Sequence, residues 1–382
     1  MFFDYTTLFR QIRRALFQTQ GTPRRLSLGR IRFFAIFALL FPFCQVTTWL
    51  GFALDRLLFP GFLKIDLKSR TLFIVGNFRS GSTFLHRLLS EDRHHFTALA
   101  SWEIYAAPSI VQRKFYHGLR MVDSLFGGHL FRRVQHWDRR VLQKIPFHSV
   151  SVWEPEEDAG LLFYCWYSLF SWFFFPDWEQ AKHLVNFGTL PTPTRRRAVR
   201  FYAGCIKRHL YAKGDPNLIF VSKNPAFTPM IYDLARYIPG SRFVALIRHP
   251  IDTYASTLGW LNFAWHVFAD PPERYTFRNE VAEMVIRWFD ILDQIPAGIE
   301  FRLIRFTELV ERSVATIESI YDFVGATLYA NRRDEIDLKG REAATRSPDS
   351  RSKADEMGLD RRWLIERFRD TIEKYGFNLD AG

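Results

Sequence analysis

A glycine-bounded loop near the start of the chain has the spacing of a phosphate-binding loop. Residues 72–75 form an apolar run typical of a buried strand. The GxxxxG spacing follows over residues 76–81, and Ser82 and Thr83 open a helical pattern. The lysine expected after the second glycine is replaced by Ser82, and Arg79 lies inside the loop instead. The N–H groups of such a loop, with the N-terminus of the next helix, bind a phosphate or sulfate group.

Two further strand patterns end in basic residues. Residues 218–222 predict a strand that leads to Lys223 in a turn broken by proline. Residues 242–247 predict another that leads to Arg248, with Ser256 eight residues later inside the next helix. Because ligands bind at the carboxyl ends of parallel strands, we expect these side chains to lie close together. An arginine fork and a helical hydroxyl together suit a terminal phosphate.

Strand and helix patterns alternate along the rest of the chain. This order predicts an α/β fold with a P-loop-like parallel sheet and helices on both faces. The expected strands are residues 72–76, 218–222, 242–247 and 300–306, and the expected helices, besides one from Ser82, are residues 109–125, 156–171, 194–212, 227–238, 251–262, 277–294, 306–325 and 360–375.

The net charge of +12 and the pI of about 9.7 favour an anionic ligand or an acidic lipid surface. A merely basic soluble surface has the same composition. Nucleic acid is not expected as a partner, because the chain has no zinc-finger spacing, RNP-like strand or Lys-rich tail. The three cysteines form no CxxC pair, and no His or Cys has ligand spacing, so we expect no metal.

Residues 33–54 carry no charge over about the length that crosses a bilayer. Pro42 and Gln45 interrupt this apolar run, so three interpretations stay open: a spanning helix, an interfacial helix or shallow hairpin, and a helix buried against the catalytic domain. We therefore divide the chain into a membrane-associating segment, 1–65, and a main domain, 66–382, that contains the three motifs. Four arginines precede the apolar run: Arg24, Arg25, Arg30 and Arg32.

The three motifs in this order strongly resemble the sulfotransferases that use 3′-phosphoadenosine 5′-phosphosulfate, over residues 72–376. The similarity is greatest to the broad bacterial branch related to carbohydrate and tyrosylprotein sulfotransferases, and it implies the sulfotransferase fold. A sulfuryl group carries less charge than a γ-phosphate, so the family needs neither a metal nor the missing lysine. The resemblance implies that the 5′-phosphosulfate is held by Arg79, Ser80, Gly81, Ser82 and Thr83, and the 3′-phosphate by Arg248 and Ser256, with Arg351 or Lys353 reaching it from a late loop.

The same resemblance assigns the residues of the transfer step. Lys223 matches the lysine that stabilises charge on the departing phosphate oxygen. Glu103, in "ASWEIY", lies where related enzymes place a glutamate and is the expected base for the acceptor hydroxyl. The rival bases are His86, His94 and His95. An acidic stretch at 153–160 either favours a helix start or lies near the acceptor, as in related enzymes.

We therefore expect a sulfotransferase that acts on a hydroxyl group of a hydrophobic or membrane-associated acceptor, lipid-like or carbohydrate. The apolar residues 33–62 and the aromatic residues 161–178 favour an oily acceptor, although 161–178 fit core packing equally well. A P-loop nucleotide kinase and a non-catalytic membrane-anchored protein that binds nucleotides or acidic lipids are the alternatives. The donor is made in the bacterial cytosol, so we expect the cytoplasmic face of a bacterial membrane; a single-pass Golgi protein is the other possibility.

Overall fold

The computed structural model describes residues 2–19, 25–145, 150–269, 271, 274–346 and 354–378. In these residues a five-stranded, fully parallel sheet has the order β2-β3-β1-β4-β5. The α/β fold expected from the sequence is confirmed. The central strand is β1, and the strands are β1 (Thr71–Gly76), β2 (Phe96–Thr97), β3 (Ile219–Lys223), β4 (Arg242–Ile247) and β5 (Glu300–Arg305).

The strand register brings three loops to one edge of the sheet. Ile74 lies opposite both Lys223 and Val244, so β1, β3 and β4 end at nearly the same level. Gly76 ends β1 with a φ of +117°, and a Cβ atom there would lie 2.3 Å from the carbonyl oxygen of Leu246. Glycine is therefore required where the chain leaves β1 so close to β4.

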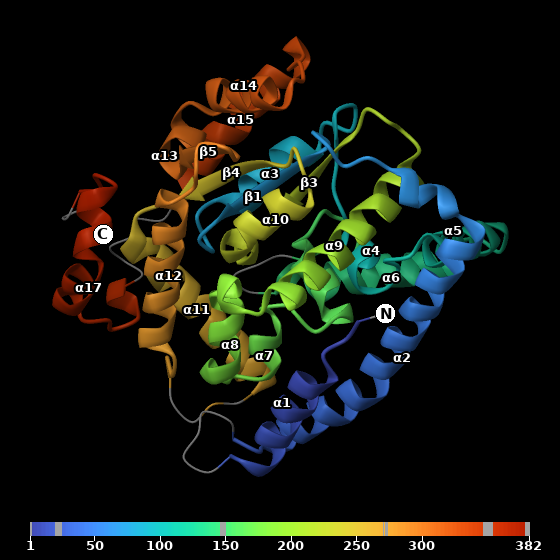
Figure 1. Ribbon diagram of the computed structural model, residues 1–382, viewed down its shortest axis with the longest axis horizontal. Helices are drawn as coiled ribbons and strands as arrows, with labels where there is room; N and C mark the ends of the chain where they lie inside the picture. The colour runs from blue at the N-terminus through green and yellow to red at the C-terminus, as the bar shows by residue number, and fades with distance from the viewer. Residues whose placement is uncertain are drawn as a thin grey trace.

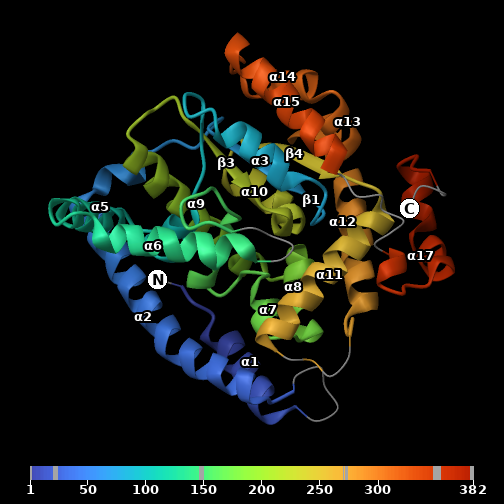
Figure 2. The ribbon, with the colours of Figure 1, turned by 180° about the vertical axis from the view of Figure 1, so that it is seen from behind.

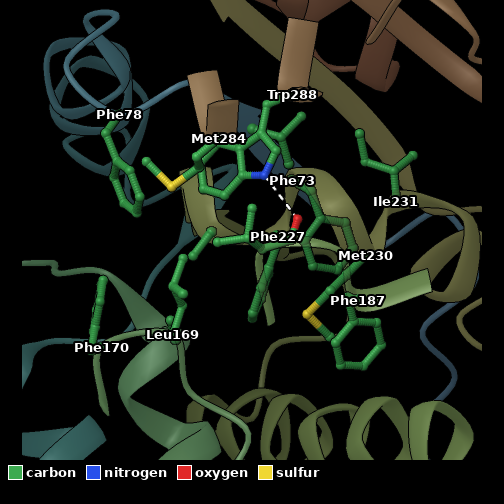
Figure 3. Close-up of a cluster of buried hydrophobic side chains, with 14 of the residues drawn as sticks. Phe73, Phe78, Leu169, Phe170, Phe187, Phe227, Met230, Ile231, Met284 and Trp288 are labelled. Atoms are coloured by element: carbon green, nitrogen blue, oxygen red, sulfur yellow. Dashed lines mark hydrogen bonds between the residues drawn. The ribbon is translucent and has the colours of Figure 1, made fainter. Parts of the chain in front are cut away.

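Helices cover both faces of the sheet, as the continuous apolar character of its strands requires. Leu72 and Ile74 of β1 pack into one core cluster, and Phe73 and Val75 pack into the other. In the second cluster the indole of Trp288 donates a hydrogen bond of 3.1 Å to the carbonyl of Val185 (Figure 3). One face is covered by α3 (Ser82–Ser90), α13 (Phe306–Glu311), α14 (Ser313–Val324) and α15 (Ala330–Arg346), the other by α9 (Thr192–Lys213), α10 (Ile231–Tyr237), α11 (Pro250–Phe268) and α12 (Arg278–Asp293).

The N-terminal helices α1 (Tyr5–Phe17) and α2 (Leu28–Leu58) run along one side of the molecule, opposite α17 (Arg361–Lys374) (Figures 1 and 2). Among the described helices α2 is the one long and apolar enough to cross a membrane. Its outer face exposes large apolar side chains, with Leu39 73% exposed. Its length and composition are weak evidence for membrane association and do not distinguish a spanning helix from an interfacial one.

Three buried polar side chains join the inner face of α2 to the rest of the protein. Arg30 donates to the carbonyl of Ala269 at 3.0 Å, and Gln45 donates to the carbonyl of Tyr164 at 2.9 Å. Asp55 accepts a hydrogen bond of 2.8 Å from Arg208. It also accepts from the first two N–H groups of α5 (Ile110–Leu125) and so caps that helix.

The helix expected over residues 156–171 is absent. That segment forms a 3₁₀ helix, η3 (Asp158–Tyr164), followed by turns. Tertiary contacts decide this, because Asp158 is held by Tyr202 and Ser222 from two other elements. The aromatic residues beyond it mostly fill the core rather than line a ligand cavity. The remaining helices are α4 (Ser101–Tyr105), α6 (His129–Arg140), α7 (Ser171–Phe174) and α8 (Trp178–Val185), with 3₁₀ turns η1 (Pro60–Lys64), η2 (Leu142–Lys144), η4 (Phe187–Thr189) and η5 (Pro225–Met230).

Candidate active site

The loop after β1 is shaped to present backbone N–H groups. Arg79 and Gly81 both adopt left-handed backbone conformations, with φ of +63° and +93°. A Cβ atom on Gly81 would lie 2.4 Å from the ring of Phe306, so this position also requires glycine. No side chain of the described residues caps the N-terminus of α3. The first turn of α3 is therefore suited to an anion.

This loop opens onto a cavity of about 700 Å³. The end of β4, the start of α13 and the acidic segment before η3 form the other walls. Five residues predicted for the site meet there: Arg79, Gly81, Ser82, Thr83 and Arg248. Glu157, Arg87, Phe306 and Lys339 also line the cavity.

Three guanidinium groups line the cavity, and those of Arg79 and Arg248 are held by different partners. Arg79 donates through Nε to the hydroxyl of Ser256 at 3.1 Å. Burial lowers the pKa of Arg79, the Glu157 carboxylate opposes that shift, and the Arg248 charge adds to it. Arg248 approaches Asp252 at 3.3 Å and stacks 5.0 Å over the ring of Phe306. Two cations that repel each other on one wall favour a multiply charged anion between them.

Ser256 lies on the far side of Arg79 from the first cavity. It lines a neighbouring cavity of about 650 Å³ together with Asn262 and Tyr275. The hydrogen bond between Arg79 and Ser256 therefore joins the two cavities. Ser80 is fully buried under the loop and does not line either cavity. Lys353 and Arg351 lie outside the described residues.

Lys223, at the end of β3, reaches the first cavity through a carboxylate. Its side chain is 1% exposed, and Nζ lies 2.8 Å from Oε1 of Glu157 and 3.5 Å from Oε1 of Glu156. Glu157 lines the cavity itself. The buried lysine and the cavity carboxylate thus form an ion pair at the edge of the cavity.

Glu103 lies away from this cavity in a buried network of its own. Oε2 accepts a hydrogen bond of 2.9 Å from the N–H of Ala100, and Oε1 lies 3.2 Å from Nη1 of Arg113. His209 contacts the same Arg113 at 3.0 Å. The structure does not bring Glu103 to the residues that would hold the donor, so its expected role as base stays a prediction.

The rival histidines do not line the cavity either. His86 is buried behind Lys223, and burial together with that charge lowers its pKa to about 3. His95 is bonded to Asp92 at 2.8 Å, and His94 is exposed. The described residues contain no group of three His, Cys, Asp or Glu side chains placed to hold a metal ion.

The sequence reasoning did not select Glu157 and Phe306. Glu157 belongs to the acidic stretch that was expected near the acceptor, but nothing local distinguishes it from its neighbours. Phe306 directly follows β5, and its place at the carboxyl end of a parallel strand was the available signal.

The chain is similar to known proteins both in sequence and in fold. The model of the Sulfotransferase family matches residues 71–330. The fold is similar to that of sulfotransferase STF9 from Mycobacterium avium, with a TM-score of 0.70 and 16% identity over 97% of this chain and 92% of that one. Sulfotransferase STF1 from Mycobacterium tuberculosis H37Rv gives a TM-score of 0.56 and 21% identity over 96% and 92%. No curated protein sequence matches the chain.

Proposed function

The chain belongs to the sulfotransferase family, and on that premise we propose that it transfers a sulfuryl group from 3′-phosphoadenosine 5′-phosphosulfate to a hydroxyl of a hydrophobic or membrane-associated acceptor. One observation carries the proposal: an uncapped helix N-terminus, Arg79 and Arg248 line the same cavity as Glu157, the partner of Lys223. When bound, the donor supplies the sulfuryl group and a phosphate that leaves.

The cavity residues fit such a donor by charge. Arg79 and the first N–H groups of α3 bind the phosphosulfate end, and Arg248 with Ser256 holds the 3′-phosphate. The hydrogen bond between Arg79 and Ser256 keeps these two proposed binding groups in contact. Lys223 stabilises negative charge on the departing oxygen.

Of the three glutamates that line the cavity, we assign the proton transfer to Glu157, because it is the one paired with Lys223. It accepts the proton of the acceptor hydroxyl while the oxygen forms its bond to sulfur and the bond from sulfur to the donor phosphate breaks. The ion pair with Lys223 holds the carboxylate at the cavity wall. Glu103 remains the rival base predicted from the sequence, and the two assignments differ in which variant loses turnover.

The exposed face of α2 supports a location at a membrane surface. Its inner face is bonded to the protein at Arg30, Gln45 and Asp55, so an interfacial position suits it better than an independent span. We place the enzyme at the cytoplasmic face of a bacterial membrane, where the donor is made; a Golgi enzyme is the alternative. Protease protection in sealed vesicles distinguishes the two sides.

Transfer of radiolabelled sulfate from the donor to a membrane extract tests the proposal. We expect labelled product with the wild type and about 10²–10³-fold less with Lys223→Met, because a charge aimed at the leaving oxygen is lost. Lys182→Met is the matched control, since Lys182 lies in an exposed pair with Glu179. Binding of adenosine 3′,5′-bisphosphate without any transfer would favour the non-catalytic alternative. Turnover of magnesium–ATP would favour the kinase.

A further inference from the structure

The helices α5 and α6 form a hairpin that projects beyond the C-terminal half of α2 (Figures 1 and 2). Its turn exposes large apolar side chains, with Leu125 82% and Phe126 75% exposed. Residues 110–145 hold eight Lys or Arg and only two Asp. An apolar tip flanked by basic residues is typical of a segment that meets anionic lipid.

An apolar groove of about 340 Å³ lies between this hairpin and α4. This volume is at the lower end of the range for ligand pockets. Among the described residues Asp123 is the one carboxylate that lines it, and that carboxylate accepts hydrogen bonds from the N–H groups of Leu130 and Phe131 at the start of α6. The groove is lined mainly by aromatic and aliphatic side chains, including Trp102, Leu119, Phe131, Val134, Val152 and Trp153.

One short segment links the groove to the cavity of the active site. Trp153 lines the groove, and Glu157, four residues later, lines the cavity. Between them Glu154 approaches Arg87, another cavity residue, at 3.6 Å. Four residues span at most about 14 Å even when fully extended.

Backbone hydrogen bonds hold this segment in place. The N–H of Trp102 donates to the carbonyl of Val152 at 3.1 Å, and the N–H of Ser101 donates to the carbonyl of Glu154 at 3.2 Å. The N–H of Glu156 donates to the carbonyl of Leu99 at 3.0 Å. The separation between the groove and the carboxylate is therefore a fixed property of the fold.

We propose that the groove between α4, α5 and α6 binds the hydrocarbon tail of the acceptor while its hydroxyl lies at Glu157. The proposal rests on the proposed function and names its substrate class: an amphiphile whose reactive hydroxyl is separated from the start of an alkyl or isoprenoid chain by a distance on the order of 14 Å. The exposed side chains of Tyr116 and Leu119 at the groove belong to the same hairpin that meets the lipid, so the chain enters from the bilayer.

Quenching of tryptophan fluorescence by a dodecyl maltoside brominated on its alkyl chain, below its micelle concentration, tests the groove directly. Trp102 and Trp153 report on it, so we expect a saturable component in the wild type that the double variant Trp102→Phe/Trp153→Phe lacks. Val134→Phe fills the groove and should weaken that component at least about tenfold, the equivalent of about two methylene groups left unburied. Val122→Phe adds the same ring to an exposed position of α5 that does not line the groove and should change nothing.

Two further measurements distinguish a failure of the groove assignment from a failure of the proposed function. Ala106→Phe adds bulk to the other wall at an exposed position and should reproduce the Val134→Phe result even if that variant folds poorly. Calorimetry with adenosine 3′,5′-bisphosphate should give the same affinity for every variant. Equal quenching in the wild type and both filled variants would overturn the groove assignment while leaving the donor site intact. Absence of bisphosphate binding in the wild type would instead overturn the proposed function, and the acceptor role of the groove with it.

Discussion

Replacing Glu157 and Glu103 by glutamine, one at a time, distinguishes the proposed catalytic base from a carboxylate that only stabilises the fold. Glu157→Gln removes the charge that faces the cavity, and Glu103→Gln removes the charge that neutralises a buried arginine. Both side chains are mostly buried, with exposed fractions of 13% for Glu157 and 7% for Glu103. The two substitutions therefore match in size and burial and differ in what the carboxylate contacts.

The structure predicts that the two substitutions differ in their effects on turnover and on the free energy of unfolding. Loss of a positioned base costs about 10²–10⁴ in turnover, or roughly 3–5 kcal/mol of activation free energy, so Glu157→Gln should show this loss. Its cost in stability should be smaller than that of Glu103→Gln, because the buried Lys223 keeps Glu156 at 3.5 Å as a second carboxylate. Glu103→Gln leaves Arg113, 5% exposed, without its carboxylate. Breaking a buried pair in this way costs about 3–5 kcal/mol of unfolding free energy. Its turnover, measured on folded protein, should stay within about threefold of the wild type because the cavity is untouched.

Single-turnover transfer of labelled sulfate measures the first quantity, and urea unfolding followed by fluorescence measures the second. Calorimetry with adenosine 3′,5′-bisphosphate serves as the control, because neither substitution removes a residue assigned to hold the donor. The reasoning is refuted if folded Glu103→Gln loses turnover a hundredfold or more while Glu157→Gln works normally. That outcome would restore the base predicted from the sequence.

Two other predictions concern burial and backbone geometry. Burial raises the pKa of Asp158 to about 7, so the unfolded chain loses this proton first and stability should fall between about pH 4 and pH 7, by up to roughly 4 kcal/mol. Unfolding of Asp158→Asn should lack that part of the slope; an unchanged slope would contradict the assignment. Gly81→Ala places a Cβ against Phe306 and should weaken bisphosphate binding about tenfold by calorimetry. Gly214→Ala, at a φ of +76° with open space around it, is the control and should bind normally.

The sequence correctly predicted the elements that are determined by residues close together in the chain. The strand over residues 242–247 and the loop from Gly76 to Gly81 lie where the pattern placed them, because glycine spacing and apolar runs fix them without distant partners. The prediction of a helix over residues 156–171 was wrong, because hydrogen bonds from α9 and β3 hold Asp158 in another conformation. The sequence did not point to Glu157 as a possible base beside Glu103. The difference between the two glutamates comes from distant partners. Arg113 pairs with Glu103 in a buried network, and Lys223 pairs with Glu157 at the cavity.

The hydrogen bonds between α2 and the rest of the protein have a consequence for the proposed membrane position. Arg30 and Asp55 lie 25 residues apart, or about 38 Å along the helix, and both are bonded to the body, so α2 cannot swing outward as a hinge. In the proposed position at a membrane surface, the outer face of α2 lies in lipid and the molecule keeps one depth and one tilt. We propose that an amphiphilic acceptor then meets the enzyme by lateral diffusion in two dimensions. On this proposal the rate depends on the mole fraction of acceptor among the lipids, not on its concentration per volume of solution.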